Sequence, residues 1–249
     1  YYLLLILFSC KIASGKGKIR GNFVMELVFL KKLFNFSKKK KHLPLTWAEI
    51  EAFHHEILEH NKSFAPLKTN ELVIWSKPFR RSKYVYLKKL LNSSDSIDQS
   101  NAIASWGLGR KTLELLKIAK ENNKPLLLLE DGFIRSLYTW AAKVDPELNA
   151  GVSFCIDTKA MYYDGTTSTD LENLLNTEIV SETQCQQARK NIDTIVKNRI
   201  SKYNNQPLSS EHLTRGGHQK RILVVDQSYG DMSLICGGVT DSVFERMIS

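Results

Sequence analysis

The sequence contains few cysteines, and none of them are arranged as a shared site. Four cysteines occur among 249 residues, at Cys10, Cys155, Cys185 and Cys236. Because no two form a Cys-x-x-Cys pair, we expect neither a zinc site nor a disulfide framework. This usage indicates a reducing compartment. We expect Cys155 and Cys185 to be core residues, since free cysteine behaves as a small hydrophobic side chain.

Long apolar runs and the common catalytic signatures are also missing. The opening run, from Tyr1 to Phe8, is far shorter than the roughly 20 residues that a membrane-spanning helix needs. The sequence has no P-loop, no Ser/His/Asp elbow and no two-metal carboxylate cluster. His54, His55 and His60 have no further ligand residues at metal-binding spacing. We therefore expect exposed helix histidines and no metal site.

The excess of positive charge is confined to one end of the chain. The net charge is +9, and residues 1–42 alone contain ten Lys or Arg residues against one acid. The remaining 25 basic and 25 acidic residues balance each other. A domain that follows the phosphates of a nucleic acid should itself be basic. Nucleic acid is therefore not an expected partner.

The N-terminal part is interpreted as two segments. Residues 1–24 precede the first methionine, Met25, and we interpret them as an upstream extension or a gene-model artefact. Residues 25–45 mix large apolar side chains with lysines, including Lys38–Lys41. Such a segment can lie in a membrane interface, where each lysine near anionic lipid contributes about 1 kcal/mol. A membrane-proximal arm and a solvated tail both fit this pattern.

The central part of the chain alternates apolar runs with polar turns. Ile103–Trp106 runs into a Gly-x-Gly-Arg turn, Gly107–Arg110, and a helix-like segment follows over 111–122. Four leucines, 126–129, then end on Glu130-Asp131. The order is strand, turn, helix and strand, with polar groups beyond the strand ends. Open α/β sheets bind ligands at that position.

Further elements are predicted on either side of this unit. Thr46 and Glu49 have capping-box spacing and predict the start of a helix. Helices are also expected after Ser168 or Thr169, and from Ser181 to about Tyr203 with one buried stripe. Strands are expected over 71–75, 151–156, 161–163 and 221–225, with a loop over 92–96.

Four motifs together resemble one protein family. They are Trp106–Arg110, the run through Glu130 that ends at Ser136, Tyr162–Asp164 followed by Leu171–Glu172, and Val225–Ser233. In this order they resemble the capsule polysaccharide biosynthesis proteins of the KpsC/LipA type, over residues 101–245. Those proteins are bacterial glycosyltransferases that transfer Kdo (3-deoxy-D-manno-octulosonic acid).

The resemblance implies an α/β, GT-B-like fold with two Rossmann-like domains. The expected domains are an acceptor-side domain over 46–203, a linker over 204–219, and the truncated start of a second domain over 220–249. The implied reaction is retaining transfer of Kdo from CMP-Kdo to a lipid-linked acceptor. It would take place at the cytoplasmic face of the bacterial inner membrane, on a peripheral protein, without a metal or another cofactor.

The partners that the resemblance implies are the nucleotide sugar, a lipid-linked saccharide acceptor, an anionic membrane surface and other capsule assembly proteins. Two alternatives stay open. One is a non-catalytic component of capsule assembly or export, and the other is an inactive fragment of the transferase.

The resemblance implies that Asp131 is the catalytic nucleophile at the mouth of a cleft, with Glu130 as a supporting or acid/base group. Neighbouring residues of a strand point to opposite sides, so only one of them readily faces the sugar. Spacing alone equally allows either carboxylate to cap the next segment or to pair with Arg135. Arg135 would bind a sugar carboxylate or an acceptor phosphate, or form an internal ion pair.

The remaining candidate residues are expected to bind substrate. Gly107, Gly109 and Arg110 would present free backbone N–H groups at a helix N-terminus, although a tight turn explains them equally well. The other candidates are Ser136, Tyr163, Asp164, Gln227 and Asp231. Ordinary turn chemistry is the alternative at Asp164-Gly165 and around Gly230.

Overall fold

The computed structural model describes residues 5–10, 46–65, 68–205, 220–225 and 231–239. The chain divides into two compact units. The larger unit contains the described residues from 46 to 205 and from 231 to 239, and the smaller unit contains 5–10 and 220–225. The described helices are α2 (Trp47–Asn61), α3 (Val85–Leu90), α4 (Arg110–Glu121), α5 (Asp170–Thr177), α6 (Glu182–Lys197) and α7 (Met232–Cys236).

The strands of the larger unit are short. They are β2 (Ile74–Trp75), β3 (Ser93–Ser94), β4 (Ile103–Trp106), β5 (Leu126–Asp131) and β6 (Phe154–Asp157). Four 3₁₀ turns accompany them, η2 (Thr69–Glu71), η3 (Lys77–Phe79), η4 (Ser82–Tyr84) and η5 (Pro146–Asn149).

The central sheet has the order β4-β5-β6. Strands β4 and β5 pair in parallel, in the register Ile103 with Leu126, and helix α4 makes the crossover between them. Parallel neighbours need such a crossover, so the predicted strand–turn–helix–strand unit is confirmed. Strand β6 pairs antiparallel with β5, which makes the sheet mixed.

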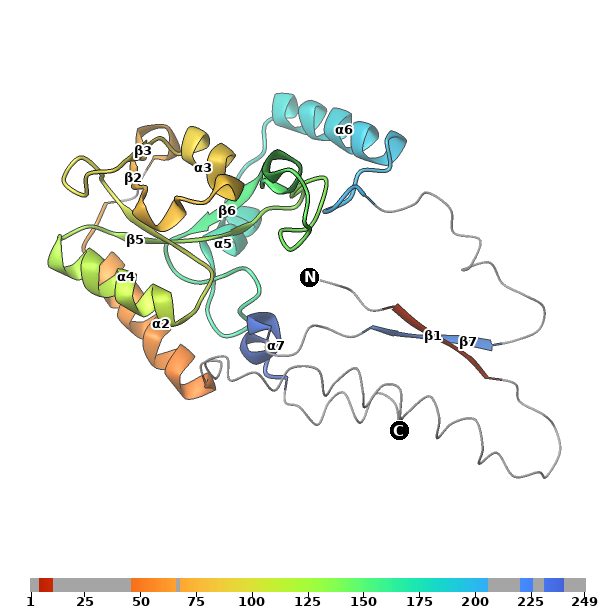
Figure 1. Ribbon diagram of the computed structural model, residues 1–249, viewed down its shortest axis with the longest axis horizontal. Helices are drawn as coiled ribbons and strands as arrows, with labels where there is room; N and C mark the ends of the chain where they lie inside the picture. Colours follow the sequence, from red (N-terminus) through yellow and green to blue (C-terminus); the bar gives the residue numbers. More distant parts are fainter. Residues whose placement is uncertain (1–4, 11–45, 66–67, 206–219, 226–230, 240–249) are drawn as a thin grey trace. The chain divides into compact units, whose positions relative to one another are not determined.

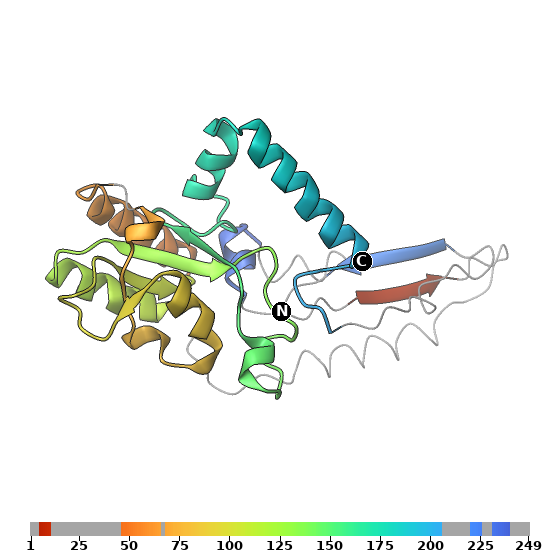
Figure 2. The ribbon, with the colours of Figure 1, turned by 90° about the horizontal axis from the view of Figure 1, so that it is seen from above.

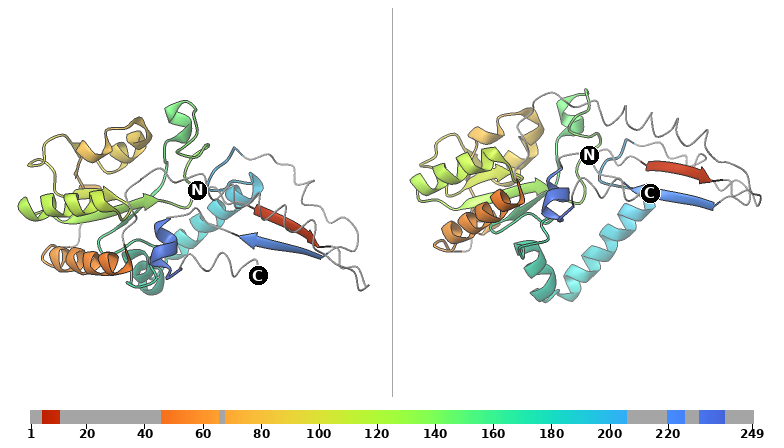
Figure 3. Two further views of the ribbon diagram at one scale, coloured as in Figure 1. Left: turned by 60° about the horizontal axis from the view of Figure 1, so that its bottom comes forward. Right: turned by 90° about the horizontal axis from the view of Figure 1, so that it is seen from below.

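The leucine run of β5 separates two hydrophobic cores. Leu126 and Leu128 pack with apolar residues of α2 and α4, whereas Leu127 and Leu129 pack with residues around η3 and α3. Alternate side chains of a strand point to opposite faces, so each face receives its own core. Figures 1 and 3 show α2 and α4 together on one side of the sheet and α3 on the other.

The predicted helix starts are confirmed by their caps. Thr46, Thr169 and Ser181 each accept a hydrogen bond from the backbone N–H three residues on, in complete capping boxes at α2, α5 and α6. A cap of this kind satisfies a backbone donor that the helix itself leaves without a partner. These starts depend on local sequence alone, and the structure bears them out.

Several predicted boundaries were wrong. Strand β5 does not stop after the leucines but includes Glu130 and Asp131, because β6 pairs with both of them. Residues 161–163 form a turn, not a strand. The predicted loop over 92–96 contains β3, which pairs in parallel with β2.

Helix α6 also differs from its prediction. It ends at Lys197, and Ile192 and Val196 on its apolar stripe are 58% and 70% exposed. Figure 2 shows α6 extending away from the sheet. The stripe is therefore not buried by the described part of the chain, and Cys185 on it is only partly buried. Cys155 is likewise partly buried, and Cys236 is buried in the core.

The smaller unit pairs β1 (Leu5–Cys10) antiparallel with β7 (Lys220–Val225). The expected strand over 221–225 is confirmed, but within the described residues its partner is β1 and not a parallel strand. Helix α7 belongs to the larger unit, where Cys236 packs into the core of α2 and α4. The expected domain bounds remain predictions.

The proposed membrane arm over 25–45 and most of the linker over 204–219 lie outside the described residues. Within the described ranges, none of the helices combines the length and apolar character needed to cross a bilayer.

Candidate functional site

The two acidic residues occupy the last two positions of β5 and face opposite sides of the sheet. Glu130 continues the side of Leu126 and Leu128, and Asp131 continues the side of Leu127 and Leu129. Glu130 is 6% exposed and Asp131 is 4% exposed. The expectation that Asp131 is open at the mouth of a cleft was therefore wrong for the described part of the chain.

Asp131 forms a buried ion pair with Arg135. The Arg135 Nε donates to Oδ1 of Asp131 at 3.0 Å, and both side chains are 4% exposed. The guanidinium also donates to Ser136 Oγ at 2.7 Å and to the carbonyl oxygen of Asn149 at 2.5 Å. Because these donors are directed at groups of the protein, the internal ion pair is the alternative that the structure supports for Arg135. The guanidinium stabilises the negative charge of Asp131.

Ser136 is part of the same buried network. Its hydroxyl donates to the carbonyl oxygen of Tyr138 at 2.6 Å while it accepts from Arg135. Ser136 is 5% exposed. In the described chain it positions Arg135 and does not face solvent.

Glu130 lies beside the turn that follows β4. A Cβ at Gly107 would lie 3.5 Å from Oε2 of Glu130 and 3.8 Å from the hydroxyl of Tyr163. Gly107 has φ +63°, a conformation that favours glycine, so the turn brings bare backbone close to this carboxyl group. Oε1 of Glu130 accepts the backbone N–H of Asp131 at 3.0 Å.

Burial raises the pKa of the Glu130 carboxyl to about 7, and the neighbouring charge of Asp131 adds to the effect. The charge of Asp231 also raises this pKa, while Lys202 lowers it. A carboxyl group with a pKa near neutrality can both donate and accept a proton at physiological pH. Glu130 is therefore the acid/base candidate of the site.

The expected anion site at the start of α4 is not formed as predicted. The Gly107 N–H donates to the carbonyl oxygen of Leu129 at 2.8 Å, and the Gly109 N–H donates to Thr112 Oγ1 at 3.2 Å. The first bond continues the pairing of β4 with β5, and the second belongs to the tight turn, which was the alternative interpretation of this motif. Arg110 is the exposed first residue of α4.

Asp164 is buried against a histidine that sequence reasoning assigned to the surface. The His54 Nδ1 lies 2.8 Å from Oδ2 of Asp164, and both residues are nearly inaccessible. Oδ1 of Asp164 accepts from the backbone N–H and the hydroxyl of Thr166. Burial tends to raise the pKa of Asp164, but the contacts with His54 and Thr166 outweigh it and leave this pKa lowered.

His54 was missed because its partner lies far away in sequence. The two residues belong to α2 and to the turn before α5, and nothing in the helix periodicity points to an acid 110 positions further on. Ile50, Phe53 and Ile57 of α2 do mark the face that packs on the sheet. His54 directly follows Phe53 on that packed face, and this position was the signal in the sequence that could have predicted its burial.

Asp231 caps α7 by accepting from the backbone N–H of Ser233 at 2.9 Å. This is the turn chemistry named as its alternative. Gln227 lies outside the described residues.

Taken together, the site and the sheet define a mixed α/β protein with a pair of carboxyl groups at the carboxyl end of its central strand. One carboxylate is held by an arginine, and the other has a pKa near neutrality. The family model for capsule polysaccharide biosynthesis proteins matches residues 101–249, which include both carboxyl groups and Arg135. The chain belongs to that family, as the sequence motifs implied.

Individual relatives agree with this assignment. The capsule polysaccharide modification protein LipA of Neisseria meningitidis serogroup A is 35% identical over 151 residues, which cover 59% of this chain and 21% of LipA. The lipopolysaccharide-processing protein LpsZ of Rhizobium meliloti is 31% identical over 139 residues, which cover 55% of this chain and 30% of LpsZ. The chain thus spans about a fifth to a third of the curated relatives that it matches.

A solved structure is also similar. KpsC of Thermosulfurimonas dismutans, described as a beta Kdo 2,4 transferase, matches with a TM-score of 0.53 and 26% identity. The match covers 71% of this chain and 55% of the KpsC chain.

Proposed function

We propose that the chain is part of a glycosyltransferase of capsule biosynthesis that transfers Kdo from CMP-Kdo to a lipid-linked acceptor. In this proposal the larger unit is the Rossmann-like, acceptor-side domain of a GT-B-like enzyme. The likeness to KpsC, a Kdo transferase, supports the substrate class. Membership of the capsule polysaccharide biosynthesis family supports the process.

The observation that carries the proposal is the carboxyl group of Glu130, buried beside the Gly107 turn with its pKa raised to about 7. Transfer forms a bond between an acceptor oxygen and the anomeric carbon and breaks the bond from that carbon to the phosphate oxygen of CMP. The acceptor hydroxyl loses its proton in this step. Glu130 in its charged form would take up that proton and release it to solvent afterwards.

The role of Asp131 changes with the structure. Both carboxyl groups are covered in the described chain, but they differ in their surroundings: the Asp131 carboxylate is paired with Arg135, whereas burial raises the pKa of Glu130 to about 7. We therefore assign the Asp131–Arg135 pair to holding the end of β5 in place. The retaining outcome rested on Asp131 as the nucleophile, and it loses that support.

We further propose that the protein works as a peripheral protein at an anionic membrane surface, where a lipid-linked acceptor is found. The mixture of lysines and apolar residues over 25–42 supports this. Deleting residues 25–42 should move the protein from the membrane fraction to the soluble fraction. Unchanged membrane association would remove this part of the proposal.

A second candidate function is a non-catalytic component of capsule assembly. The observation in its favour is that both carboxyl groups are covered in the described chain, and that Asp131 has its charge neutralised internally. A buried ion pair of this kind also occurs in scaffolds. The two candidates differ in whether the protein transfers Kdo at all.

The test measures Kdo transfer from CMP-Kdo to a lipid-linked acceptor by the chain, with T. dismutans KpsC as the positive control. The variants are Glu130→Gln, Asp131→Asn and, as a matched control on the exposed end of α4, Glu121→Gln. We expect Glu130→Gln to abolish transfer with an unchanged circular dichroism spectrum, and Glu121→Gln to leave transfer unchanged. An inactive chain beside an active control would fit the non-catalytic candidate and the inactive fragment alike, whereas an active Glu130→Gln variant would overturn the acid/base role of Glu130. If Asp131→Asn abolishes transfer without loss of stability, Asp131 regains the role of nucleophile.

A further inference from the structure

Helices α5 and α6, with the residues that connect them, form an exposed apolar surface. Neither helix contains a buried residue, although the stripe on α6 has the spacing of a helix face that packs on a partner. Figure 2 shows α6 projecting away from the sheet. Six large apolar side chains of this α5–α6 surface are each more than half exposed, namely Leu174, Leu175, Ile179, Val180, Ile192 and Val196. Exposed apolar side chains gathered in this way mark an interaction surface.

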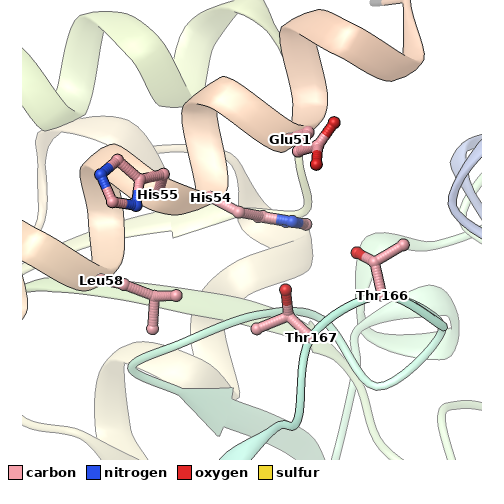
Figure 4. Close-up of a pocket in the computed structure, with 6 residues that line it drawn as sticks. All are labelled: Glu51, His54, His55, Leu58, Thr166 and Thr167. Carbon is pink, nitrogen blue, oxygen red and sulfur yellow. The ribbon is translucent and has the colours of Figure 1, made fainter.

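The folded chain holds this surface at both ends. Thr169, the N-cap of α5, is fully buried, and Thr166 and Thr167 just before it line a small pocket against α2 (Figure 4). Beyond α6, the carbonyl oxygen of Lys202 accepts the backbone N–H of Arg135 at 3.0 Å. The exposure of the α5–α6 surface is therefore not that of a loose chain end.

The charges on the α5–α6 surface are separated along the sequence. Residues 170–182 contain four acids and no Lys or Arg, whereas residues 183–199 contain four Lys or Arg and one acid. We call these stretches the acidic half and the basic half. Leu175 and Ile179 lie in the acidic half, and Val196 lies in the basic half. Each half thus combines exposed apolar side chains with one predominant sign of charge.

Several of these charges are available to a partner. Asp170 and Glu172 are used within the larger unit, in an ion pair 3.1 Å long and in the cap of α5. Glu178 and Glu182 are exposed, and Glu182 lies 3.5 Å from Arg189 with both side chains 70% exposed. Such an exposed pair is weak and exchanges readily for other contacts. The other exposed cations of the basic half are Lys190, Lys197 and Arg199.

This distribution of charge is complementary to itself. When two copies lie antiparallel, the acidic half of each faces the basic half of the other, and two-fold symmetry forms every contact twice. The exposed apolar side chains of both halves are then covered, with opposite charges around them. An anionic membrane suits the surface less well, because Glu178 and Glu182 would face charges of their own sign.

We propose that the α5–α6 surface binds a second copy of this chain, as an antiparallel two-fold dimer. The acidic half of each copy contacts the basic half of its partner, and the apolar side chains form the centre of the interface. This inference does not depend on Kdo transfer. Its test measures association and not activity.

The first measurement is sedimentation velocity of the whole chain over a range of concentrations. We expect a monomer–dimer equilibrium with a Kd of about 10 µM. The dimer should weaken as the ionic strength rises from about 0.05 M to about 0.5 M, because salt screens the exposed charges. Replacing two exposed apolar side chains together, Leu175→Ser and Ile179→Ser, should weaken the dimer at least about tenfold without changing the circular dichroism spectrum.

Exchange of charge identifies the two halves as partners. One variant combines Glu178→Lys with Glu182→Lys, and the other combines Lys190→Glu with Lys197→Glu. Each variant alone should be monomeric, because both halves of its surface then carry predominantly one sign of charge. An equimolar mixture of the two should form a dimer, because the surface of one is then basic and that of the other acidic. The matched control, Lys111→Glu with Lys117→Glu on the exposed face of α4, should dimerise as the parent chain does.

The opposite results would overturn the proposal. A parent chain that stays monomeric up to about 200 µM would do so, since that is about twenty times the expected Kd. Association that is unchanged in both charge variants would do so as well, and so would a mixture that fails to restore the dimer. A monomeric parent chain that binds vesicles of phosphatidylcholine and phosphatidylglycerol, and loses this binding with Leu175→Ser and Ile179→Ser, would assign the surface to lipid instead.

Discussion

Replacing Arg135 with methionine should strongly destabilise the chain. The substitution removes the charge that faces Asp131 at 3.0 Å, and both side chains are 4% exposed. At an effective dielectric constant of about 20, two charges at that distance attract each other by about 5–6 kcal/mol. The cost of removing both charges from water offsets most of this attraction in the native pair. The variant, however, keeps the buried charge of Asp131 and loses its partner.

The expected loss in the free energy of unfolding is about 3–5 kcal/mol, the range for breaking a buried pair from one side. Arg135→Met also leaves the carbonyl oxygen of Asn149 without the donor that now lies at 2.5 Å. A domain is typically stable by about 5–15 kcal/mol, so the loss would take up a large share of the total. Urea denaturation followed by circular dichroism measures it.

Two controls show whether the charge itself is responsible. Lys117→Met breaks the pair between Lys117 and Glu121, which is 3.8 Å long with side chains 78% and 58% exposed, and should cost less than about 1 kcal/mol. Adding Asp131→Asn to Arg135→Met should recover part of the stability, because no buried charge is then left unpaired. A loss below about 1 kcal/mol for Arg135→Met would refute the view that this pair holds the end of β5.

Three further outcomes are expected. The pKa of Glu130 is raised from 4.5 to about 7, so its contribution to stability should be fully present below about pH 4.5 and should fall by about 3 kcal/mol as the pH rises to about 7. In urea titrations at pH 4.5 and pH 8, the free energy of unfolding should therefore decline less for Glu130→Gln than for the parent chain. An identical decline in both proteins would contradict the raised pKa. Gly132→Ala would bring a Cβ to 2.9 Å from the carbonyl carbon of Ser153, and it should lower the free energy of unfolding by about 1–3 kcal/mol in the same assay. Its control is Gly109→Ser, whose Cβ meets nothing within 4 Å and which should change stability by less than about 0.5 kcal/mol. Thr169→Ala removes the fully buried N-cap of α5, so it should lower the free energy of unfolding by about 1–2 kcal/mol and lower the melting temperature. Thr169→Ser keeps the capping hydroxyl and should keep most of the stability. Equal melting temperatures of the two variants would show that the cap is dispensable.

Local features of this protein could be predicted because each depends on neighbours in the chain. The alternation of apolar runs and turns predicts β4, α4 and β5, and the Thr or Ser followed by Glu or Gln three positions later predicts the caps of α2, α5 and α6. The motif order from Trp106 to Ser233 predicts the family. In each case the signal lies within a few residues of the feature, or in the order of short motifs.

The acidic pair shows where this reasoning stops. Sequence spacing leaves Arg135 free to bind a ligand or to pair with Glu130 or Asp131, because all three arrangements satisfy the same charges. The tertiary structure selects Asp131, since Arg135 also reaches the carbonyl oxygen of Asn149 and the side-chain oxygen of Ser136. The burial that raises the pKa of Glu130 is likewise a product of packing and not of its neighbours in sequence.

By itself, then, the sequence determined the βαβ unit, the helix starts and the family, because hydrophobic periodicity and capping act over one or two turns of chain. Only the tertiary structure decided that His54 faces Asp164 across 110 residues, and that Asp131 is covered while α6 leaves Ile192 exposed. The physical reason is that burial and charge pairing depend on which surfaces the folded chain brings together. Two residues that meet only after folding leave no mark on the local pattern of either one.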